Sequence, residues 1–141
     1  MDDRRKKFAS MLIAALPHSR ALGMELVEIG EGVVEIRMPY SERLVGDPAT
    51  GVIHGGAVSA LMDTCAGAAV LSHPTGAQST ATLDLRIDYM RPATPGQAIY
   101  ARAECYHVTK SVAFVRATAF DDDRDRPVAA ATAAFTIERT K

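Results

Sequence analysis

Hydrophobic and polar residues alternate along several stretches of the chain, and this period of two predicts β-strands. Within residues 33–38, Val34, Ile36 and Met38 face one way and the charged residues between them face the other. Such alternation is typical of a sheet with one face in water. We predict six strands between turns rich in glycine, proline and aspartate: residues 24–29, 33–38, 79–90, 97–107, 112–120 and 128–138. Within residues 79–90, the alternation places four side chains on one face: Leu83, Leu85, Ile87 and Tyr89.

A run of small apolar residues predicts a helix at residues 56–72. Its apolar positions cover nearly the whole circumference, so we expect the rest of the fold to surround it. One carboxylate, Asp63, lies in the middle of this run. Because removing a charge from water costs several kcal/mol unless a partner or a task compensates, Asp63 is the first candidate functional residue.

Residues 1–20 combine a basic cluster with a short apolar run, which suits either a secretory signal peptide or an amphipathic helix. The apolar run is short, two aspartates precede the bases, and the residues after it make a poor cleavage site. Four apolar residues share one face at helical spacing: Phe8, Leu12, Ala15 and Leu16. We therefore predict an amphipathic helix that caps the domain.

The predicted elements follow one another as helix, two strands, buried helix and four strands, without an internal repeat or a linker. This order predicts one α+β domain over residues 1–141, in which a curled, mostly antiparallel sheet wraps around one central helix. A chain of 141 residues can bury one substantial core, whereas two domains of half that length would each be marginal.

Composition and charge argue against several classes of function. Hydrophobic residues make up 48% and charged residues 23%, as in soluble globular proteins, and no stretch reaches the roughly 20 apolar residues of a membrane span. The net charge of −1 gives no reason to expect nucleic acid or an anionic membrane as a partner. The two cysteines are too few for a disulfide framework and the histidines lack ligand spacing, so we expect a cytoplasmic protein without a metal.

Three motifs have the spacing of a known family: GVIHGG at residues 51–56, LMDT at residues 61–64 and DLRIDYMRPA at residues 84–93. With the order of elements, they resemble the hotdog-fold acyl-CoA thioesterases, most of all the PaaI-like branch from phenylacetate degradation, over residues 24–138. The resemblance implies hydrolysis of an acyl-CoA thioester at a site between two subunits of a dimer or a dimer of dimers. No cofactor is implied, because coenzyme A enters as part of the substrate.

The resemblance also implies roles for individual residues. Asp63 would be the general base or the nucleophile, and the backbone N–H of Gly55 would polarise the thioester carbonyl. Thr82 falls where some relatives have a serine or threonine that assists the acid. Many relatives have a loop asparagine at the position of Pro48, and Asp47, one residue earlier, is the candidate to replace it in holding the water or the loop.

Other candidate substrate contacts follow from residue chemistry. Gly56 lacks a Cβ atom, so a ligand can approach the backbone at the positive end of the helix dipole. His54 either shapes the ligand loop or is a hydrogen-bonded structural residue. The phosphates of coenzyme A require Arg or Lys near the entrance, and Arg91, Lys110 and Ser111 are candidates, with ordinary surface positions as the alternative for each.

Helix geometry constrains how Gly55 and Asp63 can act together. They are eight residues apart, which is about 12 Å along a helix at roughly 1.5 Å per residue. One thioester cannot contact both within a chain, so a shared carbonyl requires two antiparallel helices from different chains. The simpler alternatives are a tight turn at Gly55, a structural buried acid at Asp63 and an ordinary strand position at Thr82.

Two other functions stay open. A hydratase or dehydratase of the same fold would pair an imidazole such as that of His54 with a carboxylate, but the sequence offers no second acid close by. A non-catalytic module would bind acyl-CoA as a sensor, but no DNA-binding helix-turn-helix accompanies the domain.

Overall fold

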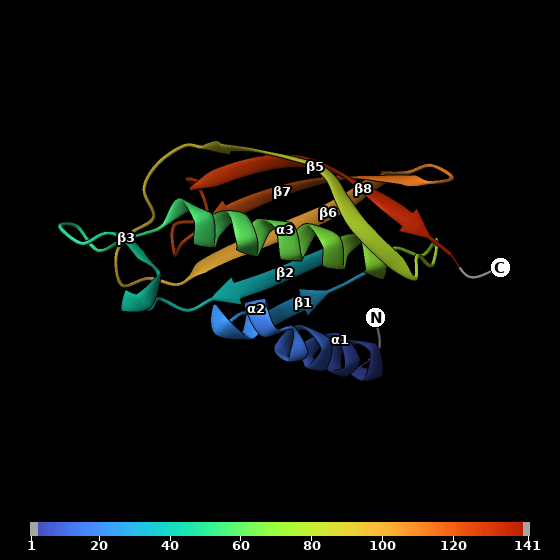
Figure 1. Ribbon diagram of the computed structural model, residues 1–141, viewed down its shortest axis with the longest axis horizontal. Coiled ribbons are helices and arrows are strands. Elements are labelled where there is room, and N and C mark those ends of the chain that lie inside the picture. The colour runs from blue at the N-terminus through green and yellow to red at the C-terminus, as the bar shows by residue number, and fades with distance from the viewer. Residues whose placement is uncertain (1–2, 140–141) are drawn as a thin grey trace.

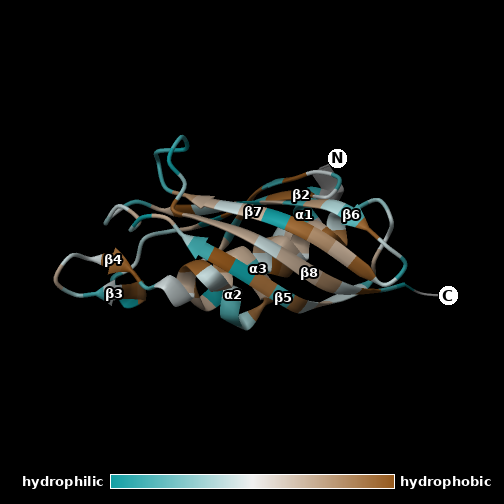
Figure 2. Ribbon diagram, turned by 90° about the horizontal axis from the view of Figure 1, so that it is seen from above, coloured by the Kyte–Doolittle hydropathy of each residue, from teal (hydrophilic) through white to brown (hydrophobic). Residues whose placement is uncertain are grey.

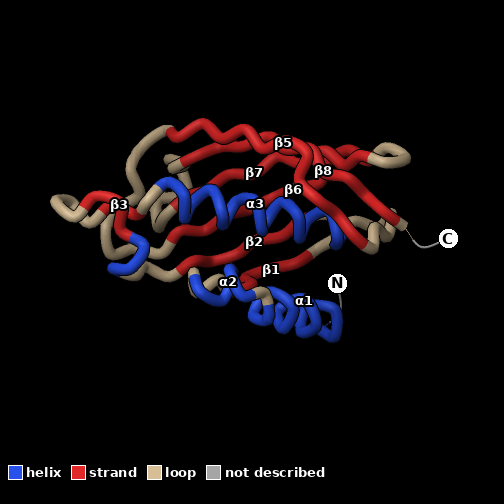
Figure 3. The backbone as a smooth tube through the Cα atoms, viewed as in Figure 1, coloured by secondary structure: helices blue, strands red, loops and turns tan. Residues whose placement is uncertain are grey.

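The computed structural model describes residues 3–139, without the side chains of residues 3–5 and 8. Six strands form one sheet in the order β1-β2-β6-β7-β8-β5, and every neighbouring pair is antiparallel. Helix α3 (Gly55–Ser72) crosses one face of this sheet (Figure 1, Figure 3). The predicted fold is confirmed, with these strand bounds: β1 (Glu25–Ile29), β2 (Val33–Met38), β5 (Ser79–Tyr89), β6 (Ile99–Val108), β7 (Val112–Phe120) and β8 (Ala129–Glu138).

The core lies between α3 and the sheet. Leu61, Met62 and Cys65 of the helix are fully buried, and they face inward strand positions such as Val34 and Val115. Figure 2 shows the hydrophobic colour along the strands and the hydrophilic colour in the loops at their ends. The burial of Cys65 raises the pKa of its thiol to about 12, so this thiol stays protonated and packs as a small apolar group.

The prediction that α3 is surrounded on all sides is wrong for the single chain. One face packs on the sheet, but a second face is only partly covered, and Leu71 on it is 38% exposed. The partly covered residues repeat at helical spacing: Ser59, Ala60, Asp63, Thr64, Gly67 and Ala68. Asp63 therefore lies on the open side of the central helix and not in the core.

Helix α3 also bears on the expectation that no segment can span a membrane. Its 18 residues are long and apolar enough to do so by length and composition alone. Half of this segment is buried inside the fold, and packing against the sheet accounts for its apolar character.

The N-terminal segment forms two helices, α1 (Asp3–Ala15) and α2 (Pro17–Ala21), which lie beside β1 (Figure 1). Pro17 begins the second helix, a position where its missing N–H and fixed φ are tolerated. The predicted apolar face is wrong in detail, because Ile13 is the buried residue and Leu12 and Leu16 are 45% and 43% exposed. The side chain of Phe8, assigned to the same face, lies outside the described part.

Strand β5 forms one edge of the sheet and contains a β-bulge. The pairing with β8 passes from Thr82–Phe135 directly to Asp84–Ala134, so Leu83 is the extra residue. The prediction that Leu83 shares a face with Leu85 is therefore wrong, and Leu83 is 57% exposed. The bulge also turns Thr82 to the side of the sheet that faces α3.

The loop before α3 contains a short 3₁₀ turn (Glu42–Leu44) and a two-stranded hairpin of β3 (Val45–Asp47) and β4 (Val52–Ile53). Gly46 is required here by a close approach, because a Cβ atom on it would lie 2.7 Å from the Cα atom of His54. The hairpin thereby fixes the residue that begins the central helix.

Candidate active site

Asp63 and Thr82 meet on the open side of α3. The Thr82 hydroxyl donates a hydrogen bond to Oδ1 of Asp63 at 2.7 Å. Within the described part of the chain, Oδ2 of Asp63 has no hydrogen-bond or ion-pair partner. Asp63 is half-buried, so this oxygen is a partly desolvated acceptor that can still reach a ligand. The bulge at Leu83 creates this pair, since uninterrupted alternation with Leu85 would turn Thr82 away from the helix.

The start of α3 presents one free backbone donor. His54 is the N-cap residue, and its Nδ1 accepts a hydrogen bond from the N–H of Gly56 at 2.7 Å. Since Nδ1 is the acceptor, the neutral imidazole carries its proton on Nε2. The N–H of Gly55 has no acceptor in the described part of the chain, and it lies at the positive end of the helix dipole. His54 thus has the contacts of a structural cap, and Gly55 has those of an anion-stabilising donor.

Two hydroxyl groups that were not predicted as site residues hold the peptide after Gly55. The hydroxyl of Tyr89 donates to the Gly55 carbonyl at 2.8 Å, and the Ser59 hydroxyl donates to the same oxygen at 3.1 Å. The two hydroxyls also contact each other. Strand alternation already places Tyr89 on the face of Leu85, but only the fold shows that this end of β5 reaches the start of α3.

Gly55 and Asp63 belong to different hollows in the surface. Gly55 lines a hollow of about 360 Å³ together with Tyr89 and Met90, whereas Asp63 and Thr82 line another of about 240 Å³. Eight helical residues place the two groups about 12 Å apart, as the sequence indicates. A single chain therefore presents an anion-stabilising donor and a carboxylate that cannot reach the same carbonyl.

The sequence pattern of the thioesterase superfamily matches residues 50–128, which include Gly55, Asp63 and Thr82. The match covers more than half of the chain. This protein belongs to the thioesterase superfamily. Members of this superfamily hydrolyse thioesters, so the chain is a thioester hydrolase with a PaaI-like hotdog fold.

Individual relatives of this thioesterase support the family in one case and the fold in the others. The medium/long-chain acyl-CoA thioesterase YigI of Escherichia coli is 26% identical over 145 residues, covering 94% of this chain and 92% of YigI. A crystal structure from Pseudomonas aeruginosa is 40% identical with a TM-score of 0.83, covering 94% of this chain and 98% of that one. The PaaI protein of the phenylacetic acid degradation operon of E. coli shares the fold, with a TM-score of 0.83 at 19% identity over 96% of this chain and 94% of its own.

Asp47 organises the loop of the thioesterase before α3. Its carboxylate accepts hydrogen bonds from the Ala49 N–H at 3.0 Å and the Thr50 hydroxyl at 2.8 Å. Its carbonyl accepts a further bond from the Gly51 N–H at 2.8 Å. Both carboxylate oxygens are thus used within the loop itself. These contacts favour holding the loop over holding a water molecule, the two roles considered for Asp47.

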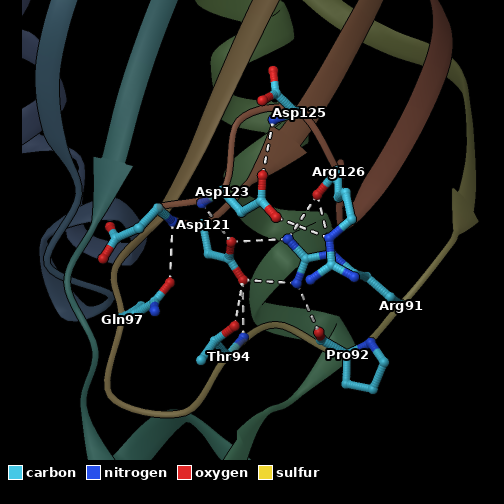
Figure 4. A network of polar contacts seen from close by, with 9 residues as sticks. Arg91, Pro92, Thr94, Gln97, Asp121, Asp123, Asp125 and Arg126 are labelled. Atoms are coloured by element: carbon cyan, nitrogen blue, oxygen red, sulfur yellow. Dashed lines mark hydrogen bonds and ion pairs between the residues drawn. The ribbon is translucent and has the colours of Figure 1, made fainter.

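Arg91 has a different environment from the one expected of a phosphate ligand. Its guanidinium forms a two-pronged ion pair with Asp121, with both N···O distances at 2.8 Å, and also donates to the carbonyls of Pro92 and Arg126 (Figure 4). All five of its N–H donors are engaged, and only 17% of the side chain is exposed. Arg91 therefore ties the end of β5 to the loop between β7 and β8.

Lys110 and Ser111 lie in the hairpin between β6 and β7. The Lys110 carbonyl accepts a hydrogen bond from the Arg139 side chain at 3.0 Å, and the Ser111 carbonyl accepts one from the Ile137 N–H at 3.1 Å. Neither residue lines the hollow of Gly55 or that of Asp63. Their role in binding phosphate stays a prediction. A third hollow, of about 250 Å³ beside Gly56, has basic groups in its lining: His18, Arg43 and His54.

The described residues contain no group of three or more His, Cys, Asp or Glu side chains that could hold a metal ion. The chemistry available at the candidate site is therefore a carboxylate with one free oxygen, a hydroxyl that orients it, and a backbone N–H at a helix terminus. These are the parts of a hydrolytic site.

Proposed function

We propose that this thioesterase hydrolyses acyl-CoA thioesters at two sites per dimer, each with Asp63 from one chain and the Gly55 N–H from the other. The observation that carries the proposal is Asp63, whose Oδ1 accepts a hydrogen bond from Thr82 and whose Oδ2 has no partner among the described residues. The name of the E. coli relative YigI supports acyl-CoA as the substrate class. The separation of about 12 Å between Gly55 and Asp63 supports a site shared by two antiparallel helices.

The reaction uses few groups. Oδ2 of Asp63 takes a proton from water while the water oxygen attacks the thioester carbonyl carbon. The Gly55 N–H stabilises the negative charge that develops on the carbonyl oxygen. Collapse of the tetrahedral intermediate breaks the carbon–sulfur bond, releases the free acid, and returns the proton to the departing thiolate.

A second route uses the same oxygen as a nucleophile. Oδ2 attacks the carbonyl carbon, coenzyme A leaves, and water hydrolyses the resulting anhydride. Single-turnover hydrolysis in ¹⁸O-labelled water tests for the anhydride. Label in the Asp63 carboxylate indicates an anhydride that water opens at the Asp63 carbonyl. Label only in the acid product is expected both from direct attack by water and from an anhydride that water opens at its acyl carbonyl.

The enzyme proposal is tested by thiol release from a panel of acyl-CoA substrates. We expect release by the wild type and a loss of about a thousandfold in both Asp63→Ala and Asp63→Asn. Release that survives both substitutions would contradict the role of Asp63. Tight binding of acyl-CoA without release from any substrate would instead favour the sensor.

The shared site is tested by mixing two inactive variants. Asp63→Asn removes the carboxylate, and Gly55→Pro removes only one N–H at the first helical position, where proline is tolerated. His54, which precedes it, has φ −59° and ψ 133°, the extended backbone that proline requires. In a mixed dimer, one of the two sites again has both groups, so random exchange of subunits should restore about a quarter of wild-type activity. No recovery after exchange has been verified would contradict the shared site.

The hydratase alternative requires an imidazole with a free basic nitrogen, which His54 does not offer. Nδ1 of His54 is occupied by the Gly56 N–H at 2.7 Å, and only Nε2–H remains as a donor. Neutral His54 therefore has no free basic nitrogen with which to abstract a proton from an acyl chain. This geometry favours hydrolysis.

A further inference from the structure

A hollow of about 240 Å³ follows the open side of α3 from Asp63 towards the C-terminus of the helix. The helix residues that line it are Asp63, Thr64, Gly67, Ala68 and Leu71, which share one face by their spacing. Asp63 and Leu71 are eight residues apart, so the hollow extends about 12 Å along the helix from the carboxylate.

The walls come from elements on both sides of the helix. Leu12 of α1 and Leu16, the residue directly after this helix, line one side, and β5 and Phe135 of β8 line the other. Figure 1 shows the C-terminal half of α3 between β5 and α1. Leu12 and Leu16 are 45% and 43% exposed, so α1 and the residue after it present two large aliphatic side chains to this hollow without burying them.

The lining separates into a polar end and an apolar body. Among the described residues that line the hollow, Asp63 is the only ionisable one, and Thr82 holds it there. Towards Leu71 the helix contributes small or aliphatic side chains. A hollow of this kind suits an aliphatic chain whose polar end lies at Asp63.

We propose that this hollow binds the acyl chain of the substrate, with α1 as one wall and Gly67 as the position that leaves room for the chain. The inference rests on the proposed function, because the acyl chain must continue from the carbonyl that Asp63 attacks. The substrate class is then a linear aliphatic acyl group that reaches past Asp63 along the helix.

Gly67 gives the sharpest test. A Cβ atom there would lie 3.6 Å from Phe135, an ordinary contact, so a larger side chain fits the helix but fills the hollow. Each buried methylene contributes about 0.8 kcal/mol, or about fourfold in affinity. In Gly67→Leu, kcat/KM should fall at least about tenfold for octanoyl-CoA and dodecanoyl-CoA. It should stay near the wild-type value for acetyl-CoA.

The α1 wall is tested by the double substitution Leu12→Ala and Leu16→Ala. Activity should fall for the long acyl groups only. Met11→Ala is the matched control, because Met11 lies on the same helix, is 63% exposed and does not line the hollow. Equal losses for all acyl lengths in the Gly67 and α1 variants would contradict the proposal.

Binding of non-hydrolysable S-butyl, S-octyl and S-dodecyl thioethers of coenzyme A separates this inference from the proposed function. Affinity that rises with alkyl length in the wild type, and no longer rises in Gly67→Leu, supports the hollow even if no substrate is hydrolysed. Affinity independent of alkyl length would overturn it while leaving hydrolysis intact. A change of oligomeric state in Gly67→Leu, without a change in length preference, would assign this face to a second copy of the chain.

Discussion

Two aspartates show how differently the same side chain can be used in this fold. Asp121 is 1% exposed, and its carboxylate accepts hydrogen bonds from the Arg91 guanidinium, from the N–H and hydroxyl of Thr94, and from the Asp123 N–H. Asp63 is half-buried and, among the residues that the structure describes, accepts one hydrogen bond, from Thr82. Burial alone therefore does not mark the functional acid.

The two aspartates differ in the number of hydrogen-bond partners of their carboxylates. The hydrogen bond from Arg91, followed by those from Thr94 and Asp123, holds the pKa of Asp121 well below its usual range. A carboxylate stabilised in this way is a weak base and has no oxygen left for a substrate. Within the described part of the chain Asp63 keeps one oxygen without a partner, which is the condition for a general base or a nucleophile.

The largest effect on activity is expected from Asp63→Asn. The amide keeps the shape and the contact with Thr82 but is neither basic nor nucleophilic, so kcat should fall by about a thousandfold. The melting temperature should change little, because the residue lies on the open side of α3. Asp84→Asn, an exposed aspartate on the same strand as Thr82, is the matched control. Unchanged turnover by Asp63→Asn would place the chemistry elsewhere.

Asp121→Asn should have the opposite effects: it should lower folding stability and leave kcat unchanged. Removing one partner of a buried ion pair costs about 3–5 kcal/mol of folding stability, measured by urea unfolding. The protein that remains folded should keep its kcat, since Asp121 lines neither the hollow of Gly55 nor that of Asp63. Exposed Asp122→Asn should leave both quantities near the wild-type values.

The ion pair of Arg91 and Asp121 should also determine part of the loss of folding stability at acidic pH. A lowered pKa in the folded state means that Asp121 contributes its full stabilisation above the unfolded pKa, at about pH 4, and loses it as the pH falls further. The wild type should therefore lose stability below about pH 4, and Asp121→Asn should lack this component. Parallel unfolding curves for the two proteins at acidic pH would contradict the assignment.

Much of the fold could be predicted because local pattern and tertiary structure agree. In the strand at Val33–Met38, the inward residues Val34, Ile36 and Met38 are buried as the alternation predicts. Glu35 on the other face is buried too, in ion pairs with Arg102 and Arg124. The small apolar residues of 56–72 do form the central helix, which begins one residue earlier. The bulge at Leu83 could not be predicted, because nothing in residues 79–90 distinguishes an unpaired residue from one in the ladder.

The candidate site was predictable only in part. Gly55 and Asp63 came from a motif, and helix geometry gave their separation. The environment of Arg91 could not be predicted, because its partner Asp121 is 30 residues away in a loop of similar acidic residues. Tyr89 and Ser59 depend on how the end of β5 meets the start of α3, which is likewise a long-range contact.

Thr82→Val should have an intermediate effect. Valine has the shape of threonine without the hydroxyl, so Asp63 loses the hydrogen bond that orients it, and kcat should fall by about tenfold with little change in KM. Thr82→Ser should restore most of the activity, and Thr132→Val, at an exposed strand position, should have no effect. A loss confined to KM would mean that Thr82 contacts the substrate and does not act through Asp63.

The smallest effect is expected from Tyr89→Phe. The Gly55 carbonyl accepts from both Tyr89 and Ser59, so removing one hydroxyl leaves the other in place. Each single variant, Tyr89→Phe or Ser59→Ala, should lower kcat by about twofold, since a neutral hydrogen bond contributes about 1 kcal/mol at most sites and here is partly replaced.

The double variant tests whether the two hydroxyls support one another as the partners of Asp121 do. If they hold the same peptide redundantly, the loss of kcat in the double variant should exceed the product of the two single losses. Losses that simply multiply would show that the two hydroxyls act independently and that neither replaces the other when it is removed. Gly55 would then differ from Asp121, whose carboxylate accepts hydrogen bonds from Arg91, Thr94 and Asp123 at the same time.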